Sequence, residues 1–190
     1  MNLKFLTIIA FLGAPFLAVG VYTEVYFPAL SSSWWTGLWG LLYCTGWMGS
    51  LEALRRLELA GTDRFGTGNV WSIQIGLIVA NASNVWQLVA PSYKPDFFWI
   101  LDTAWPLSNL LMLPLGIAVL RAHRLSGLQR WVPLAVGLWL PLSMALRQTA
   151  VGLHVSNGYS LIAWSVLALT VRQAGKNKRR FTRSEKLAIQ

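Results

Sequence analysis

Amide side chains recur on one side of an otherwise apolar stretch between residues 70 and 90. Gln74 and Asn81 are seven residues apart, and Asn84 follows three residues later. Because an α-helix turns by ~100° per residue, these three side chains share one face. The chemistry open to such a stripe is hydrogen bonding, either to a neighbouring helix or to a bound molecule.

A second polar stripe follows between residues 97 and 120. Asp102 and Asn109 are again seven residues apart, with Trp105 between them. We expect this face to meet the first stripe. Two further residues join the candidates: Arg147, a basic residue placed against the charge bias of the chain, and His154, which the predicted topology places near it. An ion pair between Asp102 and Arg147 is the economical interpretation, and an anionic ligand group bound by Arg147 is the alternative. The predicted ligand-binding residues are Asn81, Asn84, Asp102, Trp105, Asn109, Arg147 and His154.

Several other chemistries lack the residues they need. The two histidines fall at opposite ends of the predicted helices, no cluster supplies the three or four ligands of a zinc site, and Cys44 is the single cysteine. The loop from Gly61 to Gly68 has no Gly-Lys-Ser/Thr ending that would cradle phosphates. A serine nucleophile beside His154, oriented by Asp102, has no specific spacing to recommend it. We therefore predict no metal, no cofactor and no catalytic residue, and the sequence leans against an enzyme.

The composition indicates which elements carry these residues. Of 190 residues, 55% are hydrophobic and 12% charged, and eleven are tryptophan. Soluble domains average roughly 25% charged residues, so this chain is predicted to reside in a membrane. A lone cysteine also excludes a disulfide scaffold.

Apolar stretches long enough to cross a bilayer occur six times, since a spanning helix needs about 20 residues. The sequence thus predicts an all-α fold, a polytopic transmembrane helical bundle, with a single domain over residues 1–175 and a basic tail over 176–190. Cleavage of a signal peptide near Gly20 is the alternative for the first span and would leave five. The six spans are Phe5–Tyr22, Trp34–Leu54, Val70–Ala90, Phe97–Leu120, Trp131–Leu146 and His154–Val171.

The basic residues predict the orientation. Placing both termini in the cytoplasm puts fourteen of the sixteen Lys and Arg residues on that side, leaving Lys94 and Arg147 outside. The expected location is a bacterial inner membrane. The net charge of +9 does not indicate nucleic-acid binding, because the basic residues lie at helix ends. The tail is interpreted as a topology anchor, or alternatively as a regulatory or partner-binding segment.

Proline and glycine positions predict how the helices bend and pack. Pro15, Pro106, Pro114, Pro133 and Pro141 are expected to interrupt hydrogen bonding in the first, fourth and fifth spans. The second span carries Gly37, Gly40, Gly46 and Gly49, which give small-residue surfaces for close helix contact. These surfaces predict contact within the chain, a homo-oligomer or a partner subunit.

Six tryptophans lie deep within the predicted spans, where each indole N–H requires a partner. Packing and ligand contact are both open for them. They are Trp39, Trp47, Trp86, Trp105, Trp139 and Trp164.

Residues 39–49, with Gln74 and residues 81–86, resemble the second and third helices of the translocator/tryptophan-rich sensory protein family. The resemblance implies a five-helix bundle that binds porphyrins and sterol-like molecules. The Trp-x-Pro-Pro loop of that family is absent, and this chain has an extra predicted span. We treat the resemblance as an analogy.

The function expected from the sequence is binding or transport of a small ligand, anionic or lipid-like, in an outward-facing cavity within the bundle. The partners are then the lipid bilayer and that ligand. The main alternative is an accessory or scaffold subunit that packs its glycine-rich second span against a larger membrane protein. A tryptophan-rich sensory-like protein or a membrane enzyme are weaker alternatives.

Overall fold

The computed structural model describes residues 2–146, 149 and 151–188, with side chains as far as residue 178. All the regular structure in these residues is helical, which confirms the all-α prediction. The elements are α1 (Leu3–Gly13), α2 (Phe16–Tyr26), η1 (Pro28–Leu30), α3 (Trp34–Arg56), α4 (Arg64–Val89), α5 (Asp96–Asp102), α6 (Ala104–Ala122), η2 (Gly127–Trp131), α7 (Val132–Leu146) and α8 (Gly152–Ala188).

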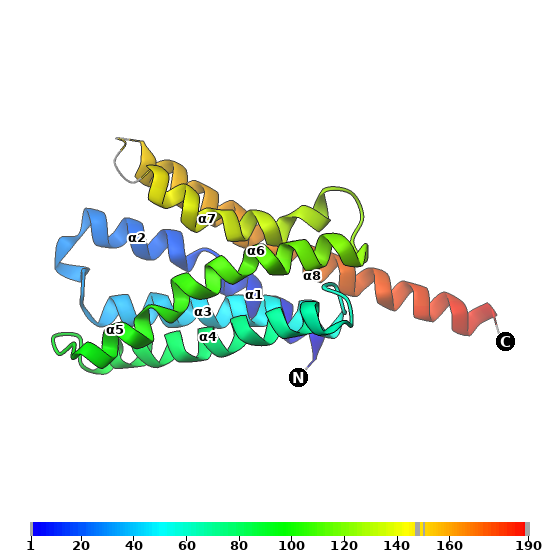
Figure 1. Ribbon diagram of the computed structural model, residues 1–190, viewed down its shortest axis with the longest axis horizontal. Coiled ribbons are helices and arrows are strands. Elements are labelled where there is room, and N and C mark those ends of the chain that lie inside the picture. Colours follow the sequence, from blue (N-terminus) through cyan, green and yellow to red (C-terminus); the bar gives the residue numbers. More distant parts are fainter. Residues whose placement is uncertain (1, 147–148, 150, 189–190) are drawn as a thin grey trace.

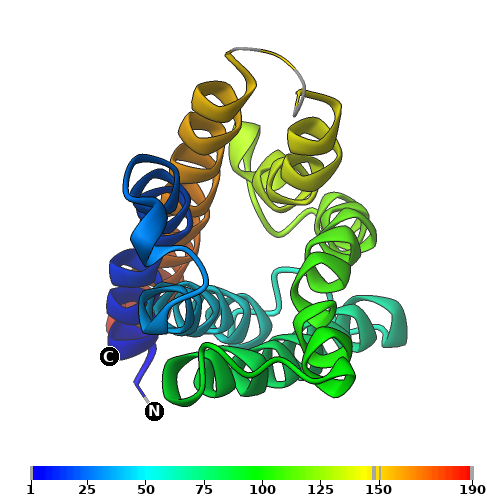
Figure 2. The same cartoon turned by 90° about the vertical axis from the view of Figure 1, so that its left-hand side faces the viewer.

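The helices form one bundle in which the chain passes back and forth between two ends (Figure 1). The N-terminus, the α3–α4 connection and the α6–α7 connection lie at one end, and α8 leaves the bundle there. The α2–α3 and α4–α5 connections lie at the other end. Viewed along the bundle, the helices are arranged in a ring (Figure 2). Neighbours in the ring include the pairs α1·α3, α3·α4, α4·α6, α6·α7 and α7·α8.

Within the described residues, two helical stretches are long and apolar enough to cross a membrane by length and composition alone: Leu3–Tyr26 and Asp96–Ala122. Six such stretches were expected. Two of the expected stretches miss this criterion for local reasons. Helix α7 has only 15 residues, and α4 carries the amide stripe of Gln74, Asn81 and Asn84. The helical bundle is therefore confirmed, and two of the six expected spans meet this criterion.

Proline explains the breaks in the two stretches just named. Pro15 has no N–H to donate to the carbonyl of Phe11, and α1 ends at Gly13 before α2 begins at Phe16. Pro106 likewise cannot donate to Asp102, where α5 ends. Pro114 lies inside a continuous helix, as Pro141 does in α7.

The prediction that Pro133 interrupts the hydrogen bonding of the fifth span was wrong. This residue is the second of α7, within the first turn, where backbone N–H groups have no acceptor inside the helix. The helix therefore begins at Val132 without a break.

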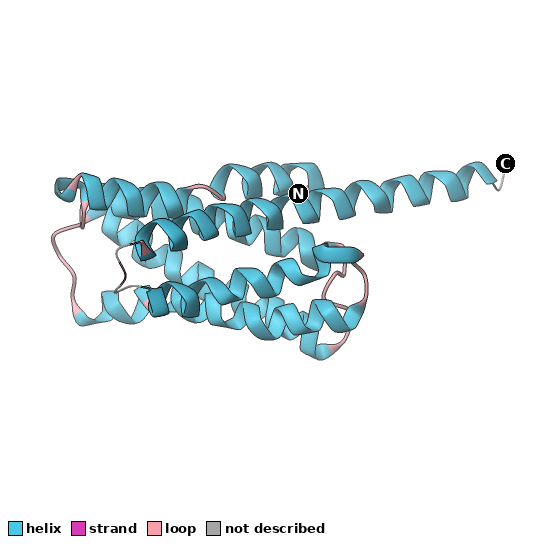
Figure 3. Cartoon of the chain, turned by 90° about the horizontal axis from the view of Figure 1, so that it is seen from above, coloured by secondary structure: helices cyan, strands magenta, loops and turns pink. Residues whose placement is uncertain are grey.

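Helix α8 is longer than the span expected from the sequence. It continues from Gly152 to Ala188 and includes the segment expected to be a tail from residue 176 (Figure 3). The basic segment is therefore a helical extension that projects from the bundle.

Close contacts of α3 depend on its glycines. A Cβ added at Gly46 would lie 2.6 Å from the Cα of Gly13 in α1, and one at Gly37 would lie 2.4 Å from the carbonyl oxygen of Asn84 in α4. Such distances leave no room for a side chain. The glycine-rich helix thus packs against two neighbours within the same chain.

We expect Gly46→Ala to destabilise the bundle by about 1–3 kcal/mol, because the added methyl must push α1 away from α3. Gly68→Ala is the control: it also lies in a helix, and nothing lies within 4 Å of a Cβ built there. Thermal unfolding of the solubilised proteins measures both. Equal melting temperatures for the two variants would show that the α1–α3 contact is not this close.

Candidate functional site

The amide stripe of α4 faces α3. Asn84 donates from Nδ2 to Asn81 Oδ1 at 3.1 Å and lies 3.7 Å from the sulfur of Cys44. Asn81 lies 3.7 Å from the sulfur of Met48, and Gln74 Nε2 lies 3.5 Å from the backbone oxygen of the same residue. The expectation that this stripe meets the polar face of residues 102–109 was wrong, since its amides contact α3 instead.

Asp102 lies at the last residue of α5 and is half-buried. Its Oδ1 is 3.3 Å from Ser83 Oγ on α4, on a different face from the amide stripe. The proposed partner of Asp102, Arg147, lies outside the described residues, so the predicted ion pair stays a prediction.

Asn109 lies within the α6–α7 contact and is fully buried. Its Nδ2 donates to the carbonyl of Val136, and its Oδ1 accepts from the N–H of Leu140, both at 3.3 Å. The Val136 carbonyl and the Leu140 N–H are four residues apart in α7, and Leu140 directly precedes Pro141. The side chain therefore inserts beside the hydrogen-bond ladder of α7 where proline weakens that ladder.

Trp105 and His154 belong to two further contacts. The Trp105 ring lies 5.9 Å from that of Trp139 on α7. The Nδ1 of His154 lies 3.2 Å from the hydroxyl of Tyr22, which joins α8 to α2. Of the described candidates, the structure brings together Asn81 and Asn84. It places Asp102, the Trp105–Asn109 pair and His154 in separate helix contacts.

Tyrosine and tryptophan rings meet in the interior of the bundle. The rings of Tyr43 and Trp47 on α3 lie 5.5 and 5.7 Å from that of Trp164 on α8. Trp164 in turn lies 5.7 Å from Trp139. We call Tyr43, Trp47, Trp139 and Trp164 the central aromatic cluster. Their angled, edge-on contacts are the favoured arrangement for aromatic pairs.

Half of the deep tryptophans satisfy their N–H groups. Trp39 Nε1 donates to the carboxylate of Glu24, which also accepts from Thr36. The indole N–H groups of Trp86 and Trp139 donate to backbone carbonyls, each at 2.9 Å. The requirement for a partner is therefore met at these positions.

Four buried donor groups on α3 and α8 have no partner among the described residues. They are Tyr43 OH, Trp47 Nε1, Trp164 Nε1 and Asn157 Nδ2. Each side chain is at most 2% exposed. Asn157 and Trp164 are seven residues apart and share a face of α8. We call these four the donor cluster; one other buried donor without a partner, Nε of Arg130, lies apart from it in η2.

An isolated buried donor that lacks a partner costs about 1–3 kcal/mol. All four can donate and none is a carboxylate or imidazole. The donor cluster can thus donate hydrogen bonds to acceptor oxygens, and it offers no general base. No group of three His, Cys, Asp or Glu side chains able to hold a metal ion occurs among the described residues.

Sequence reasoning identified this region only in part. Trp47, Trp139 and Trp164 were singled out as deep tryptophans, but Tyr43 and Asn157 were not among the seven predicted ligand-binding residues. The signal that could have found Asn157 is its spacing of seven from Trp164.

No known family model, curated protein or solved structure matches this chain. The resemblance of residues 39–49 to the tryptophan-rich sensory family therefore gains no support from a family match.

We expect Tyr43→Phe to stabilise the ligand-free protein by about 1 kcal/mol, because it removes a buried hydroxyl that has no partner and keeps the ring. Tyr159→Phe is the matched control, since that hydroxyl donates to the Ala135 carbonyl at 2.7 Å, and its removal should cost about 1 kcal/mol. Unfolding of both variants in detergent measures the difference. Equal losses of stability would mean that the Tyr43 hydroxyl has a partner in the native protein.

Proposed function

We propose that this chain is a multi-pass membrane protein that binds a small ligand within its bundle, at the donor cluster. The six passes are α1 with α2, α3, α4, α5 with α6, α7 and α8. Both termini then lie on the cytoplasmic side.

The distribution of polarity supports membrane insertion. Large apolar side chains are more than half exposed along the outer faces of the helices, among them Ile8, Leu12, Ile75, Ile78, Ile100, Leu107, Met144 and Ile162. Polar side chains are buried inside, among them Gln74, Ser83, Gln87, Asn109 and Asn157. So much exposed apolar surface is unfavourable in water but favourable in lipid, where polar side chains face the interior of the bundle.

The charges at the two ends support the orientation. Arg55 and Arg56 lie in the last turn of α3, and Arg124 lies in the connection after α6. These helix ends lie at the end of the bundle that holds the N-terminus, where α8 also leaves it (Figure 1). Short connections rich in Lys and Arg are retained in the cytoplasm.

The donor cluster is the observation that carries the ligand-binding proposal. In a bilayer no water reaches unsatisfied donors from the lipid side, so acceptors must come from inside the bundle. A ligand with a carbonyl, ether or carboxylate oxygen supplies them, and the central aromatic cluster supplies flat apolar contact surface.

The glycines of α3 favour this proposal over the accessory-subunit alternative. Gly46 and Gly37 contact α1 and α4 of the same chain. The glycine surface that would receive a partner helix is therefore covered from within.

Cysteine labelling tests the membrane topology. In a Cys44→Ser background, Ser92→Cys should react with a membrane-impermeant maleimide only in right-side-out vesicles, and Ser126→Cys only in inside-out vesicles. Both positions are exposed, Ser92 in the α4–α5 connection and Ser126 before η2. Labelling of both from the same side would overturn the proposed topology.

Native mass spectrometry of gently solubilised protein tests ligand binding. We expect a discrete adduct of small mass that denaturation releases. Its occupancy should fall about tenfold in Tyr43→Phe, because one neutral hydrogen bond is lost. Asn157→Leu should act alike.

Tyr159→Phe is the control for this measurement and should keep the adduct, since its hydroxyl is already bonded within the protein. A bare wild-type chain would contradict the ligand proposal. An adduct that survives both Tyr43→Phe and Asn157→Leu would place the ligand elsewhere.

A further inference from the structure

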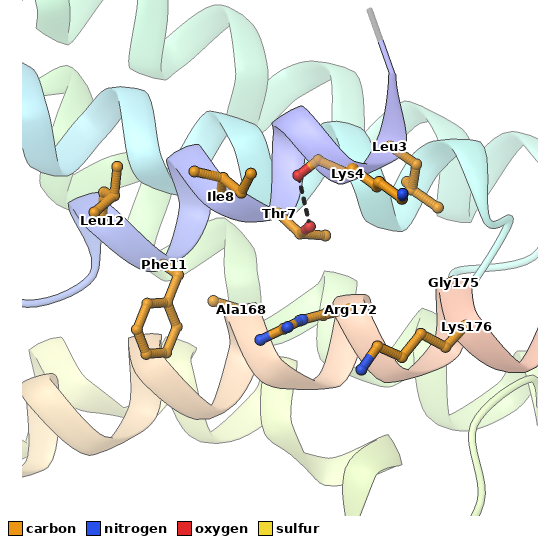
Figure 4. A pocket seen from close by; sticks show the side chains of 10 residues that line it. All are labelled: Leu3, Lys4, Thr7, Ile8, Phe11, Leu12, Ala168, Arg172, Gly175 and Lys176. Carbon is orange, nitrogen blue, oxygen red and sulfur yellow. Dashed lines mark hydrogen bonds between the residues drawn. The ribbon is translucent and has the colours of Figure 1, made fainter.

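A groove of about 330 Å³ runs between α1 and α8 at the end of the bundle that holds the N-terminus (Figure 4). Leu3 seals one part of it by packing on Gly175, where an added Cβ would lie only 2.6 Å from the leucine side chain. Ala168 and Thr7, both buried, form its floor. The Thr7 hydroxyl donates to the Lys4 carbonyl and is thereby occupied.

Three cations line this groove: Lys4 from α1, and Arg172 and Lys176 from α8. All three side chains are exposed, and no acidic residue is among the lining residues. Figure 4 shows Arg172 and Lys176 lying along the α8 side of the groove.

Three other cations at this end of the bundle are paired with acids. Arg55 and Arg56 both bind Glu52, at 2.8 and 2.6 Å, and Arg124 lies 3.9 Å from Glu58. Lys4, Arg172 and Lys176 form no ion pair with any side chain that the structure describes. Their charge is therefore available to an anion from outside the protein.

The rest of the groove is apolar. Ile8, Phe11 and Leu12 of α1 line it and are each more than half exposed. They follow Lys4 by one to two helical turns, toward the middle of the bundle. Charge at the end and apolar surface toward the middle is the polarity of a phospholipid whose headgroup lies at the cytoplasmic face.

We propose that this groove binds an anionic membrane phospholipid, with its phosphate between Lys4, Arg172 and Lys176 and an acyl chain along Ile8, Phe11 and Leu12. Arg172 can bind two phosphate oxygens at once, whereas the two lysines act as point charges. The proposal rests on the proposed membrane insertion and is independent of the ligand in the donor cluster.

The test is lipid binding to the full chain in mild detergent, measured by native mass spectrometry. The probes are phosphatidylglycerol, which is anionic, phosphatidylcholine, which is zwitterionic, and inorganic phosphate. We expect one phosphatidylglycerol to bind in preference to phosphatidylcholine, and inorganic phosphate not to displace it, because phosphate has no chain to contact the apolar part.

Substitution of the three cations should remove the preference for phosphatidylglycerol over phosphatidylcholine. In the triple variant Lys4→Gln, Arg172→Gln and Lys176→Gln, affinity for phosphatidylglycerol should fall roughly 100-fold, since each basic residue near an anionic headgroup contributes about a factor of five. These side chains are exposed, so the fold should persist. The control Arg64→Gln, Arg121→Gln and Arg124→Gln removes the same charge from the same end, outside the groove, and should keep the preference.

Three outcomes would overturn the lipid site. Equal binding of both lipids would remove the role of the headgroup charge. Displacement by inorganic phosphate would indicate a site for soluble anions. An equal loss in the control variant would indicate diffuse attraction to the basic end.

The cysteine-labelling experiment separates this proposal from the proposed function. A chain with the proposed topology but no lipid preference would overturn the lipid site alone. Labelling of Ser92→Cys and Ser126→Cys from the same side would overturn the membrane topology on which both proposals depend.

Discussion

The close approach of α3 to its neighbours is the constraint on which the rest of the bundle depends. This helix presents three different faces to three helices. Gly37 and Gly40 face α4, Gly46 and Gly49 face α1, and Tyr43 with Trp47 faces α8. At ~100° per residue these pairs point in three directions. The small faces let two helices come near, and the large face then fills the space left inside the ring. A larger residue at the small faces would widen the ring and loosen the aromatic contacts.

Interior hydrogen bonds follow from the same geometry. Helices that pack closely leave little space for water, so amide side chains bond to neighbouring backbone and sulfur atoms. Asn109 bridges two backbone groups of α7, and Gln87 donates to the Ser33 carbonyl that precedes α3. Each bond of this kind contributes modestly to stability in a membrane, averaging ~0.6 kcal/mol. Their main effect is to fix which helix faces which, because a rotated helix would leave the amide unsatisfied.

Helices were predictable from the sequence to a greater extent than contacts. The apolar stretches and the prolines located most helix limits, and the polar stripe of α4 was recognised from its spacing. Its partner was not, because periodicity gives the face of a helix and says nothing about which neighbour covers it. The same limit applies to the aromatic cluster: Tyr43 and Trp164 are 121 positions apart, and only the fold shows that they meet. The continuation of α8 was also missed, because a hydropathy criterion ends a span where charge begins, although Lys and Arg are good helix formers.

Helix α8 carries two sets of polar groups that have no partner among the described side chains, first neutral donors and then cations. Asn157 and Trp164 contribute donors in the first half of α8, and Arg172 and Lys176 contribute cations further along it. From Trp164 onward these residues are spaced by multiples of four, so they form a stripe that turns slowly around the helix. The stripe begins against α3 and ends against α1, because its drift carries it from one neighbour to the next. One continuous helix therefore carries neutral donors along its first half and cations further along, and in the membrane insertion that we propose the two sets would lie at different depths.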